Sequence, residues 1–236
     1  MKIRIMTYNT LHCAAYRRGM MIDFPLFAEA IGSFSPDVVT LQEIRSKGVD
    51  EGYDDQTLEI SRLLGMPYRK FAEAIRFRGV NPYGNSIVSG LPISSSEVIM
   101  IPDPETKRVP DGYYETRCIL KAKLECGITV MTVHVGLNPD EQENAMKTVL
   151  EHIEDEKCIL TGDFNMTPDN PLFDALRERM CDTGELLSAD AFTFPSDAPW
   201  EKIDYIFTSR DLRVTRVDVP KIIVSDHLPV IADIEF

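Results

Sequence analysis

The nine residues Lys157-Cys158-Ile159-Leu160-Thr161-Gly162-Asp163-Phe164-Asn165 decide how this chain is interpreted. Residues 157–160 are typical of a short buried strand, and residues 168–171 are typical of a loop that leads to a helix. Asp163 and Asn165 therefore lie where a strand ends, which is where α/β proteins bind ligands. If strand geometry continues to Asn165, both side chains point to the same side. The Asp163 carboxylate could then take a proton from water or hold a metal, and the Asn165 amide could hold a phosphate oxygen. The alternative is an Asx turn that only closes the loop.

The acidic composition limits the classes of ligand. The chain has 236 residues and a formal net charge of −13, with 38 Asp and Glu against 25 Lys and Arg. Such a body repels nucleic-acid phosphates at long range and lacks the broad basic surface of a duplex binder. A phosphorylated ligand stays compatible, because a metal ion and a few local Arg can reverse the field inside a cleft. We therefore do not expect duplex DNA as a partner, and no obligate protein partner is evident.

Cysteine usage and hydropathy favour a cytoplasmic protein. The five Cys are scattered and form no CxxC pair, so neither zinc nor redox spacing is present. Most of them lie in apolar segments, which is typical of small core residues in a reducing compartment. Residues 1–6 alternate like a strand and lack the apolar core of a signal peptide. No apolar run approaches the length of a membrane span.

Strands are expected at both ends of the chain, and helices separate only some of them. The expected helices cover residues 23–34, 56–64, a segment that begins at Asn138-Pro139, and 171–180. The expected strands cover residues 3–8, 38–41, 68–75, 85–89, 93–101, 116–125, 128–134, 157–160, 203–207, 214–217 and 229–234, with another near Phe192. This mixture predicts an α/β (α+β) fold in which two mixed, mostly antiparallel sheets pack face to face with helices outside.

Several polar residues share one property, which is that each ends or interrupts an apolar strand. They are Asn9, Glu43, His134, Asp163, Asn165, Asp204 and the pair Asp226-His227. Burying an unpaired carboxylate is costly, so these groups should meet partners or a metal. Strand ends gathered on one edge would place them in a single pocket. Each position also has a purely structural interpretation, as a turn residue, an ion-pair partner, a satisfied core His or a backbone cap.

The order of short motifs carries a resemblance to a known family. The motifs are Thr7-Tyr8-Asn9, Leu41-Gln42-Glu43, Gly84-Asn85-Ser86, Val133-His134-Val135, Gly162-Asp163-Phe164-Asn165, Ile203-Asp204-Tyr205 and Ser225-Asp226-His227-Leu228-Pro229-Val230. Taken together, they resemble the endonuclease/exonuclease/phosphatase (DNase I-like) superfamily over nearly the whole chain. The resemblance implies one catalytic domain over residues 1–236, a four-layer α/β sandwich and Mg²⁺-dependent phosphoester hydrolysis.

The resemblance also implies how metal and water are held. Glu43 would be the main metal ligand, with Asn9 and Asp226 nearby, and Asp163 would orient or deprotonate the attacking water. Carboxylate and amide oxygens suit Mg²⁺ or Mn²⁺, and no thiolate cluster competes. Leu11 stands where abasic-site endonucleases carry an Asp, so a metal arrangement that needs this Asp is not expected.

The remaining implied roles concern the phosphate. Asn165 would hold a phosphate oxygen, and His227, oriented by Asp204, would contact the phosphate and stabilise its charge. A carboxylate beside a His fixes its tautomer and favours imidazolium, which suits an anionic transition state. His134 matches the His that some branches of the superfamily use near the leaving group.

Three further residues are candidates for substrate binding. Arg117 is carried by an expected strand and could lie near the cleft, or could instead be a structural partner of Glu115. Tyr83 could form a wall of the pocket or belong to the core. Arg17 lies in an expected loop and is either a solvated charge or a ligand for a second phosphate or a carboxylate.

Two classes of function follow from these expectations. The first is a cytosolic Mg²⁺-dependent phosphodiesterase or phosphatase that acts on a phosphorylated small molecule or on single-stranded nucleic acid. Within this class, an endonuclease or exonuclease is the alternative to a small-molecule enzyme. The second class is a catalytically silent protein that only binds a phosphorylated ligand or a partner.

Overall fold

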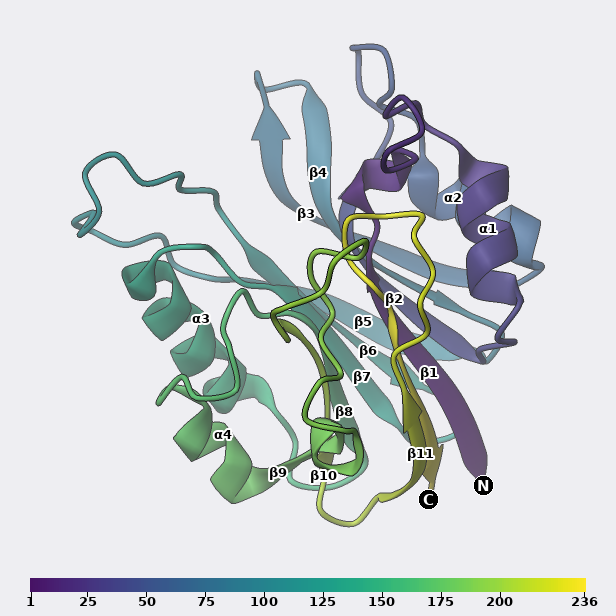
Figure 1. The fold of residues 1–236 in the computed structure, drawn as a ribbon, viewed down its shortest axis with the longest axis vertical. Helices are drawn as coiled ribbons and strands as arrows, with labels where there is room; N and C mark the ends of the chain where they lie inside the picture. The colour runs from purple at the N-terminus through teal and green to yellow at the C-terminus, as the bar shows by residue number, and fades with distance from the viewer.

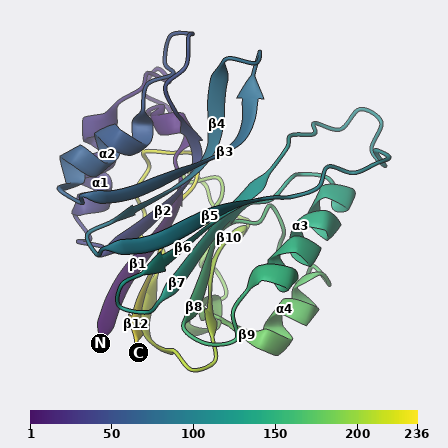
Figure 2. The same cartoon turned by 180° about the vertical axis from the view of Figure 1, so that it is seen from behind.

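Two six-stranded β-sheets pack face to face, and two pairs of helices cover their outer faces (Figure 1, Figure 2). This arrangement comes from a computed structural model, which describes residues 1–236. The helices are α1 (Phe24–Gly32), α2 (Gln56–Leu64), α3 (Pro139–His152) and α4 (Phe173–Arg179), with short 3₁₀ segments at Leu11–Cys13 and Thr183–Leu186. The expected four-layer sandwich is therefore confirmed.

Each sheet contains one parallel pair among antiparallel pairs, as expected for mixed, mostly antiparallel sheets. The first sheet has the order β11 (Arg213–Asp218), β12 (Val230–Glu235), β1 (Lys2–Asn9), β2 (Val38–Arg45), β4 (Asn81–Ser89) and β3 (Tyr68–Phe77). The second has the order β5 (Ile93–Met100), β6 (Cys118–Leu124), β7 (Thr129–His134), β8 (Cys158–Asp163), β10 (Asp204–Ser209) and β9 (Met180–Asp182).

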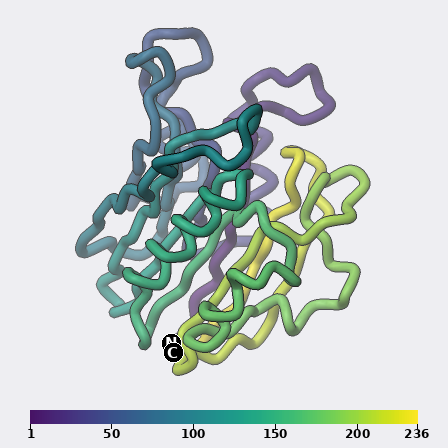
Figure 3. Tube along the Cα trace, turned by 90° about the vertical axis from the view of Figure 1, so that its left-hand side faces the viewer, coloured from purple at the N-terminus to yellow at the C-terminus, as the bar shows by residue number.

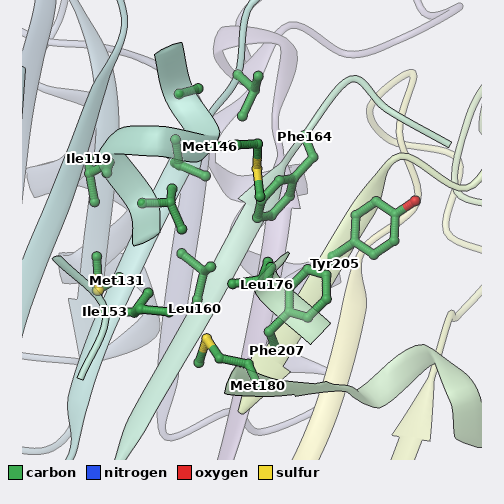
Figure 4. Close-up of a cluster of buried hydrophobic side chains, with 14 of the residues drawn as sticks. Ile119, Met131, Met146, Ile153, Leu160, Phe164, Leu176, Met180, Tyr205 and Phe207 are labelled. Carbon is green, nitrogen blue, oxygen red and sulfur yellow. The ribbon is translucent and has the colours of Figure 1, made fainter. Parts of the chain in front are cut away.

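Three apolar clusters fill the spaces between the layers. One lies between the two sheets and includes Ile5, Val130 and Ile206. A second packs α1 and α2 onto the first sheet. The third packs α3 and α4 onto the second sheet around Phe164 (Figure 4). Burial of this apolar area is the main term that holds the layers together.

The local signals that predicted the helices are present in the structure. The Asp23 carboxylate accepts a hydrogen bond from the Leu26 amide at 3.0 Å and so caps α1. At the start of α3 the backbone N–H of Asn138 donates to Glu141 Oε2 at 3.1 Å, which is half of a capping box. Gly65, at φ 66°, ends α2 in the left-handed conformation that favours glycine.

Three strand expectations need correction. The strand expected to end at Gln42-Glu43 continues to Arg45, because a bulge between Leu41 and Ile44 lets pairing with β4 resume beyond it. The loop expected between residues 75 and 85 is mostly strand, because β3 and β4 form one long hairpin. The strand expected near Phe192 is wrong, because only one isolated bridge forms there, from Phe194 to Glu201.

The chain termini lie side by side at one end of the molecule (Figure 3). Lys2 at the start of β1 pairs with Glu235 at the end of β12, whereas Asn9 lies at the other end of β1. The polar residues therefore collect at the end of the sandwich opposite the termini. None of the helices has the length and apolar character needed to cross a membrane.

Candidate functional site

The second sheet presents three polar side chains in a row across adjacent strands. His134 ends β7 and Asp163 ends β8, and the parallel register places these two residues opposite each other. Asp204 begins β10, where the antiparallel register places it opposite Asp163. The three side chains are almost completely buried. The sequence expectation that strand ends would gather these groups is therefore correct.

Gly162 allows this close packing immediately before Asp163. Its φ of 145° is one that side chains rarely adopt. A Cβ at Gly162 would overlap the carbonyl oxygen of Val133 on β7. A glycine is thus required at this position for β7 and β8 to approach each other beside the site.

The first sheet contributes two groups from its own parallel pair. Asn9 ends β1 and lies opposite Gln42 of β2. Glu43 lies in the β2 bulge with φ 59°, an uncommon conformation for a residue other than Gly. Asn9 Nδ2 donates to Glu43 Oε1 at 3.1 Å. The bulge therefore re-aims Glu43 towards the end of β1, as bulges near functional sites commonly do.

A loop before β12 supplies the pair Asp226-His227. Its backbone is fixed by two hydrogen bonds, from the Ser225 amide to the Tyr8 hydroxyl at 3.1 Å and from the Ser196 amide to the Asp226 carbonyl at 2.6 Å. The His227 ring packs against Phe194, with ring centroids 4.8 Å apart. These contacts restrain the loop where it enters the site.

The Asp163 carboxylate is the centre of the site cluster, the name used below for Asn9, Glu43, His134, Asp163, Asn165, Asp204, Asp226 and His227. Asp163 Oδ2 lies 2.9 Å from Asn9 Nδ2, 3.4 Å from His134 Nε2 and 3.7 Å from His227 Nε2. Asp163 thereby connects the two sheets and the loop.

Asn165 lies beyond the end of β8 and does not continue the strand. Its φ is 49°, and its backbone N–H donates to Asp163 Oδ1 at 3.0 Å, so the Asx turn is present. The side chain nevertheless returns to the site, since Nδ2 lies 2.9 Å from the Val135 carbonyl and 3.2 Å from His134 Nε2. The turn is thus present, and the Asn165 side chain still lies in the site, although strand alternation is not the reason.

Burial and charge set the protonation of Asp163 and His227 together. Burial raises the pKa of Asp163, the Asp204 charge raises it further, and His227 and Asn9 oppose the shift. Burial lowers the pKa of His227, but the Asp204 and Asp163 charges outweigh it and raise that pKa. His227 Nδ1 lies 2.9 Å from Asp204 Oδ2. A positively charged imidazolium therefore lies beside the Asp163 carboxyl group.

Glu43 stays ionised within this surrounding. Burial alone would raise its pKa, but the nearby His12 imidazole, the His134 ring, the Asn9 amide and the His227 ring together outweigh burial and lower the pKa below its ordinary value. Burial raises the pKa of Asp226, and the Glu43 charge adds to this shift. Two carboxylates that repel each other suit a hard divalent cation. Asn9 presents Nδ2 to Glu43, while its Oδ1 accepts from the Leu11 amide, so Asn9 would have to turn its oxygen towards a bound ion.

A second group of possible ligands is less suited to a cation. Atoms of Asp163, Asp204 and His227 lie within 4.8 Å of one another. The hydrogen bond between Asp204 and His227 already uses one ligand atom of each residue. An imidazolium has no lone pair for a metal. Glu43, Asn9 and Asp226 therefore fit a metal better than this group does.

The three candidate substrate residues differ in position. Arg117 is buried, and its Nη1 lies 3.0 Å from His134 Nδ1, which places it against the site cluster. Tyr83, on β4, is buried; burial and then the Glu43 charge raise its pKa well above the ordinary value. Arg17 is exposed and forms an ion pair with Asp197, and it makes no hydrogen bond or ion pair with the site cluster.

Sequence reasoning missed several residues that support the cluster. His12 Nδ1 lies 3.9 Å from Glu43 Oε2, and Phe194 packs on His227. Gln42 Nε2 donates to Thr132 Oγ1 at 2.8 Å and so joins the two sheets beneath the site. Of these, only Gln42 had a sequence signal, since it adjoins Glu43. Glu115 forms an ion pair with Arg117 Nη1 at 2.8 Å, which is the structural partnership that the sequence offered as the alternative for Arg117.

A surface cavity of about 690 Å³ lies apart from these residues. Trp200, Lys202 and Arg177 are among its lining residues, and no member of the site cluster lines it. We therefore place the candidate active site at the site cluster, where the polar groups converge, and not at this cavity.

Comparisons with known proteins agree with the fold. The model of the Endonuclease/Exonuclease/phosphatase family matches residues 6–227. No curated protein sequence matches the chain. An endonuclease/exonuclease/phosphatase from Beutenbergia cavernae has a similar structure, with a TM-score of 0.82 and 21% identity over 99% of this chain and 71% of that chain.

Two other similar structures bear more specific names. The mannosyl-6-phosphatase Bt3783 of Bacteroides thetaiotaomicron has a TM-score of 0.77 and 19% identity, covering 99% of this chain and 100% of that chain. The human Nocturnin catalytic domain with bound sulfate has a TM-score of 0.70 and 19% identity, covering 100% of this chain and 93% of that chain. At these identities the likeness concerns the fold.

Proposed function

Since the chain belongs to the Endonuclease/Exonuclease/phosphatase family, we propose that it is a metal-dependent hydrolase of phosphoester bonds. One observation carries this proposal: the buried Asp163 carboxylate meets Asn9 at 2.9 Å, His134 at 3.4 Å and His227 at 3.7 Å. A carboxylate surrounded by donors from three elements is suited to hold water against a phosphorus atom. We assign the whole of residues 1–236 to one catalytic domain.

Asp163 orients the attacking water and accepts its proton. Its raised pKa, caused first by burial, makes it a better base than an exposed carboxylate. Positioning the water next to the phosphorus removes much of the entropic cost of the attack.

Glu43, Asn9 and Asp226 would hold the metal, which we propose to be Mg²⁺, with Mn²⁺ as a substitute. Their carboxylate and amide oxygens fit a hard cation, and the lowered pKa of Glu43 keeps this ligand ionised at neutral pH. When bound, such an ion polarises the phosphoryl group and stabilises the charge that develops there.

His227 and Asn165 contact the phosphate in this proposal. The raised pKa of His227 supplies a positive charge, and Asp204 holds the ring at 2.9 Å in one orientation. A fixed charge in a buried site stabilises an anionic transition state more than the same charge does in water. Asn165 would donate to a phosphate oxygen, and His134 would act near the leaving group.

We propose a small or single-stranded phosphorylated substrate. The net charge of −13 disfavours duplex DNA, and one structural relative is named as a mannosyl-6-phosphatase. Tyr83 and Arg117 would border the substrate, and Arg17 would contact it only after leaving Asp197. A cytoplasmic location agrees with five cysteines that form no disulfide.

A substrate panel tests the class of reaction. The purified protein with Mg²⁺ or Mn²⁺ would be offered sugar phosphates, inositol phosphates, nucleotides and single-stranded oligonucleotides at low salt. Release of inorganic phosphate from small monoesters alone would support a phosphatase, and cleavage of oligonucleotides would support the nuclease alternative. Tight binding of a phosphorylated ligand without turnover would favour a silent binding protein and contradict the enzyme.

A further inference from the structure

The side chain of Arg117 contacts His134 on the ring edge that faces away from Asp163. Arg117 Nη1 lies 3.0 Å from His134 Nδ1, while His134 Nε2 lies 3.4 Å from Asp163 Oδ2. Both Arg117 and His134 are buried. The two ring nitrogens of His134 therefore have different neighbours, a guanidinium on one side and the site cluster on the other.

A guanidinium can donate hydrogen bonds but cannot accept them. His134 Nδ1 must therefore be the acceptor in this contact, which leaves the proton of a neutral ring on Nε2. The opposite tautomer would place two donors face to face at 3.0 Å. Rotating a side-chain amide can relieve such a conflict, but no rotation gives a guanidinium an acceptor.

An acceptor and a donor both lie near Nε2. Asp163 Oδ2, 3.4 Å away, is the acceptor that a proton on Nε2 would face. Asn165 Nδ2, 3.2 Å from Nε2, is a donor that also donates to the Val135 carbonyl at 2.9 Å. The Asn165 side-chain amide can reorient, whereas the Arg117 guanidinium has no acceptor in any orientation, so the contact with Arg117 decides the tautomer.

Glu115 holds Arg117 in place for this contact. Arg117 Nη1 also forms an ion pair with Glu115 Oε1, at 2.8 Å. The other Glu115 oxygen accepts from the Tyr113 hydroxyl at 2.7 Å. This buried pair restrains the guanidinium, which makes its use as a free phosphate clamp less favourable than its use as a partner of His134.

We propose that Arg117 is a positioning residue that fixes His134 as the neutral tautomer with its proton on Nε2. His134 then enters the site as a hydrogen-bond donor towards a phosphate oxygen, and it does not accept a proton from water. This consequence for catalysis rests on the proposed function, whereas the tautomer itself does not.

The charges around His134 support a neutral ring. Burial lowers its pKa well below the ordinary value, the Arg117 charge lowers it further, the Glu43 charge opposes, and the His227 charge lowers it again. Asp163 also faces the ring. Proton transfer is thereby left to Asp163 and His227.

Nitrogen-15 NMR of the histidine side chains tests the tautomer without substrate or turnover. The chain has four His, so the signals of His134 can be assigned by their loss in His134→Gln. At pH 7 we expect an unprotonated Nδ1 and a protonated Nε2. A protonated Nδ1 in the wild-type protein, with or without a proton on Nε2, would by itself overturn the proposal.

Substitution of Arg117 provides a second test. In Arg117→Met, the single tautomer of His134 should be replaced by a mixture of the two neutral tautomers. Arg117→Lys should keep a larger share of the tautomer with its proton on Nε2. Arg108→Gln, at an exposed ion pair with Glu143, should leave the His134 signals unchanged. Unchanged signals of the other three His would show that the fold persists. An unchanged His134 pattern in folded Arg117→Met would contradict the proposal.

Activity separates this proposal from the proposed function. With a phosphoester substrate, Arg117→Met should lose about 10-fold or more in kcat/KM, as removal of a group that orients a functional histidine does. If the wild type shows the expected tautomer but no turnover, the proposed function fails and the tautomer assignment stands. If turnover is normal but Nδ1 is protonated, only the assignment fails.

Discussion

His227 Nδ1 lies 2.9 Å from Asp204 Oδ2, and both residues are almost completely buried. The carboxylate keeps the ring in one orientation, with Nε2 directed towards Asp163 at 3.7 Å. The Asp204 charge is also a main reason that the pKa of His227 is raised despite burial. The pair therefore determines both the position and the charge of the imidazole.

Replacing Asp204 should impair catalysis without changing the fold. Asp204→Asn keeps the size of the side chain but removes its charge, so His227 loses its orientation and its preference for imidazolium. We expect kcat to fall by about 10²-fold, in line with the loss of an acid–base or electrostatic group. Asp174→Asn, at an exposed position on α4, is the matched control. Equal rates for Asp204→Asn and wild type would refute the role of the pair.

Glu43 should dominate metal affinity. Glu43→Gln removes an ionised ligand whose pKa is lowered by its neighbours, and affinity follows the number of ligand charges. Calorimetric titration with Mn²⁺ should show a loss of roughly 10-fold or more, by the same dependence on ligand charge. Glu59→Gln on the exposed face of α2 should bind Mn²⁺ as the wild type does. If Asp204→Asn lost Mn²⁺ while Glu43→Gln kept it, the cation would belong to the other group of ligands.

Phe164 should be essential for stability because it fills the space beneath the site. It is fully buried and packs against Phe173, Tyr205 and Phe207, with ring centroids about 5.5 Å away. Phe164→Ala should cost about 3–5 kcal/mol of unfolding free energy. In thermal unfolding this corresponds to a Tm lower by roughly 6–20 °C. Leu186→Ala, at a residue that is 62% exposed, should stay within about 0.5 kcal/mol of wild type.

The ion pair between Arg4 and Asp233 should make part of the stability depend on acid pH. The hydrogen bond from Arg4 Nε, at 2.6 Å, is the main cause that lowers the pKa of Asp233 to about 2, burial opposes it, and Lys2 contributes further. An unfolded Asp titrates near pH ~3.9. The pair therefore stabilises the fold fully above that pH, and its contribution is lost as the pH falls through about 2.

Denaturant unfolding of Asp233→Asn measures this contribution. The variant should be less stable than wild type at pH 7, and the difference should shrink as the pH falls from about 4 towards 2, because the wild-type carboxyl then becomes neutral as well. Asp218→Asn, at an exposed pair with Arg216, should show little difference at any pH. A gap between Asp233→Asn and wild type that stays constant down to pH 2 would contradict the account.

The sequence predicted those parts of the fold that depend on neighbouring residues. The bounds of α2 were predicted correctly, because Gly65 ends the helix in a conformation that favours glycine. The cap of α3 at Asn138 was predicted for the same kind of reason. The bulge at Glu43 was not, because it arises from the register between β2 and β4, which no local pattern encodes.

In the site, too, residues with a local sequence signal were predicted, and contacts that depend on distant parts of the chain were not. Asp163, His134 and Asp204 were predicted together because each ends or interrupts an apolar strand. The contact of Arg117 with His134 could not be predicted, because it depends on the pairing of β6 with β7 and on the path of the chain before β6. Similarly, Phe194 reaches His227 from a loop without regular structure, so its spacing in sequence carried no signal.

The most direct test of the central claim is the rate of hydrolysis of bis-p-nitrophenyl phosphate with Mg²⁺ or Mn²⁺ by wild type, Asp163→Ala and His227→Ala. We expect measurable turnover by the wild type and a loss of about 10²-fold or more in each variant, because each lacks an acid–base or electrostatic group. Circular dichroism would establish that the variants are folded. Wild-type rates in folded Asp163→Ala and His227→Ala would contradict the assignment of this site as the catalytic centre.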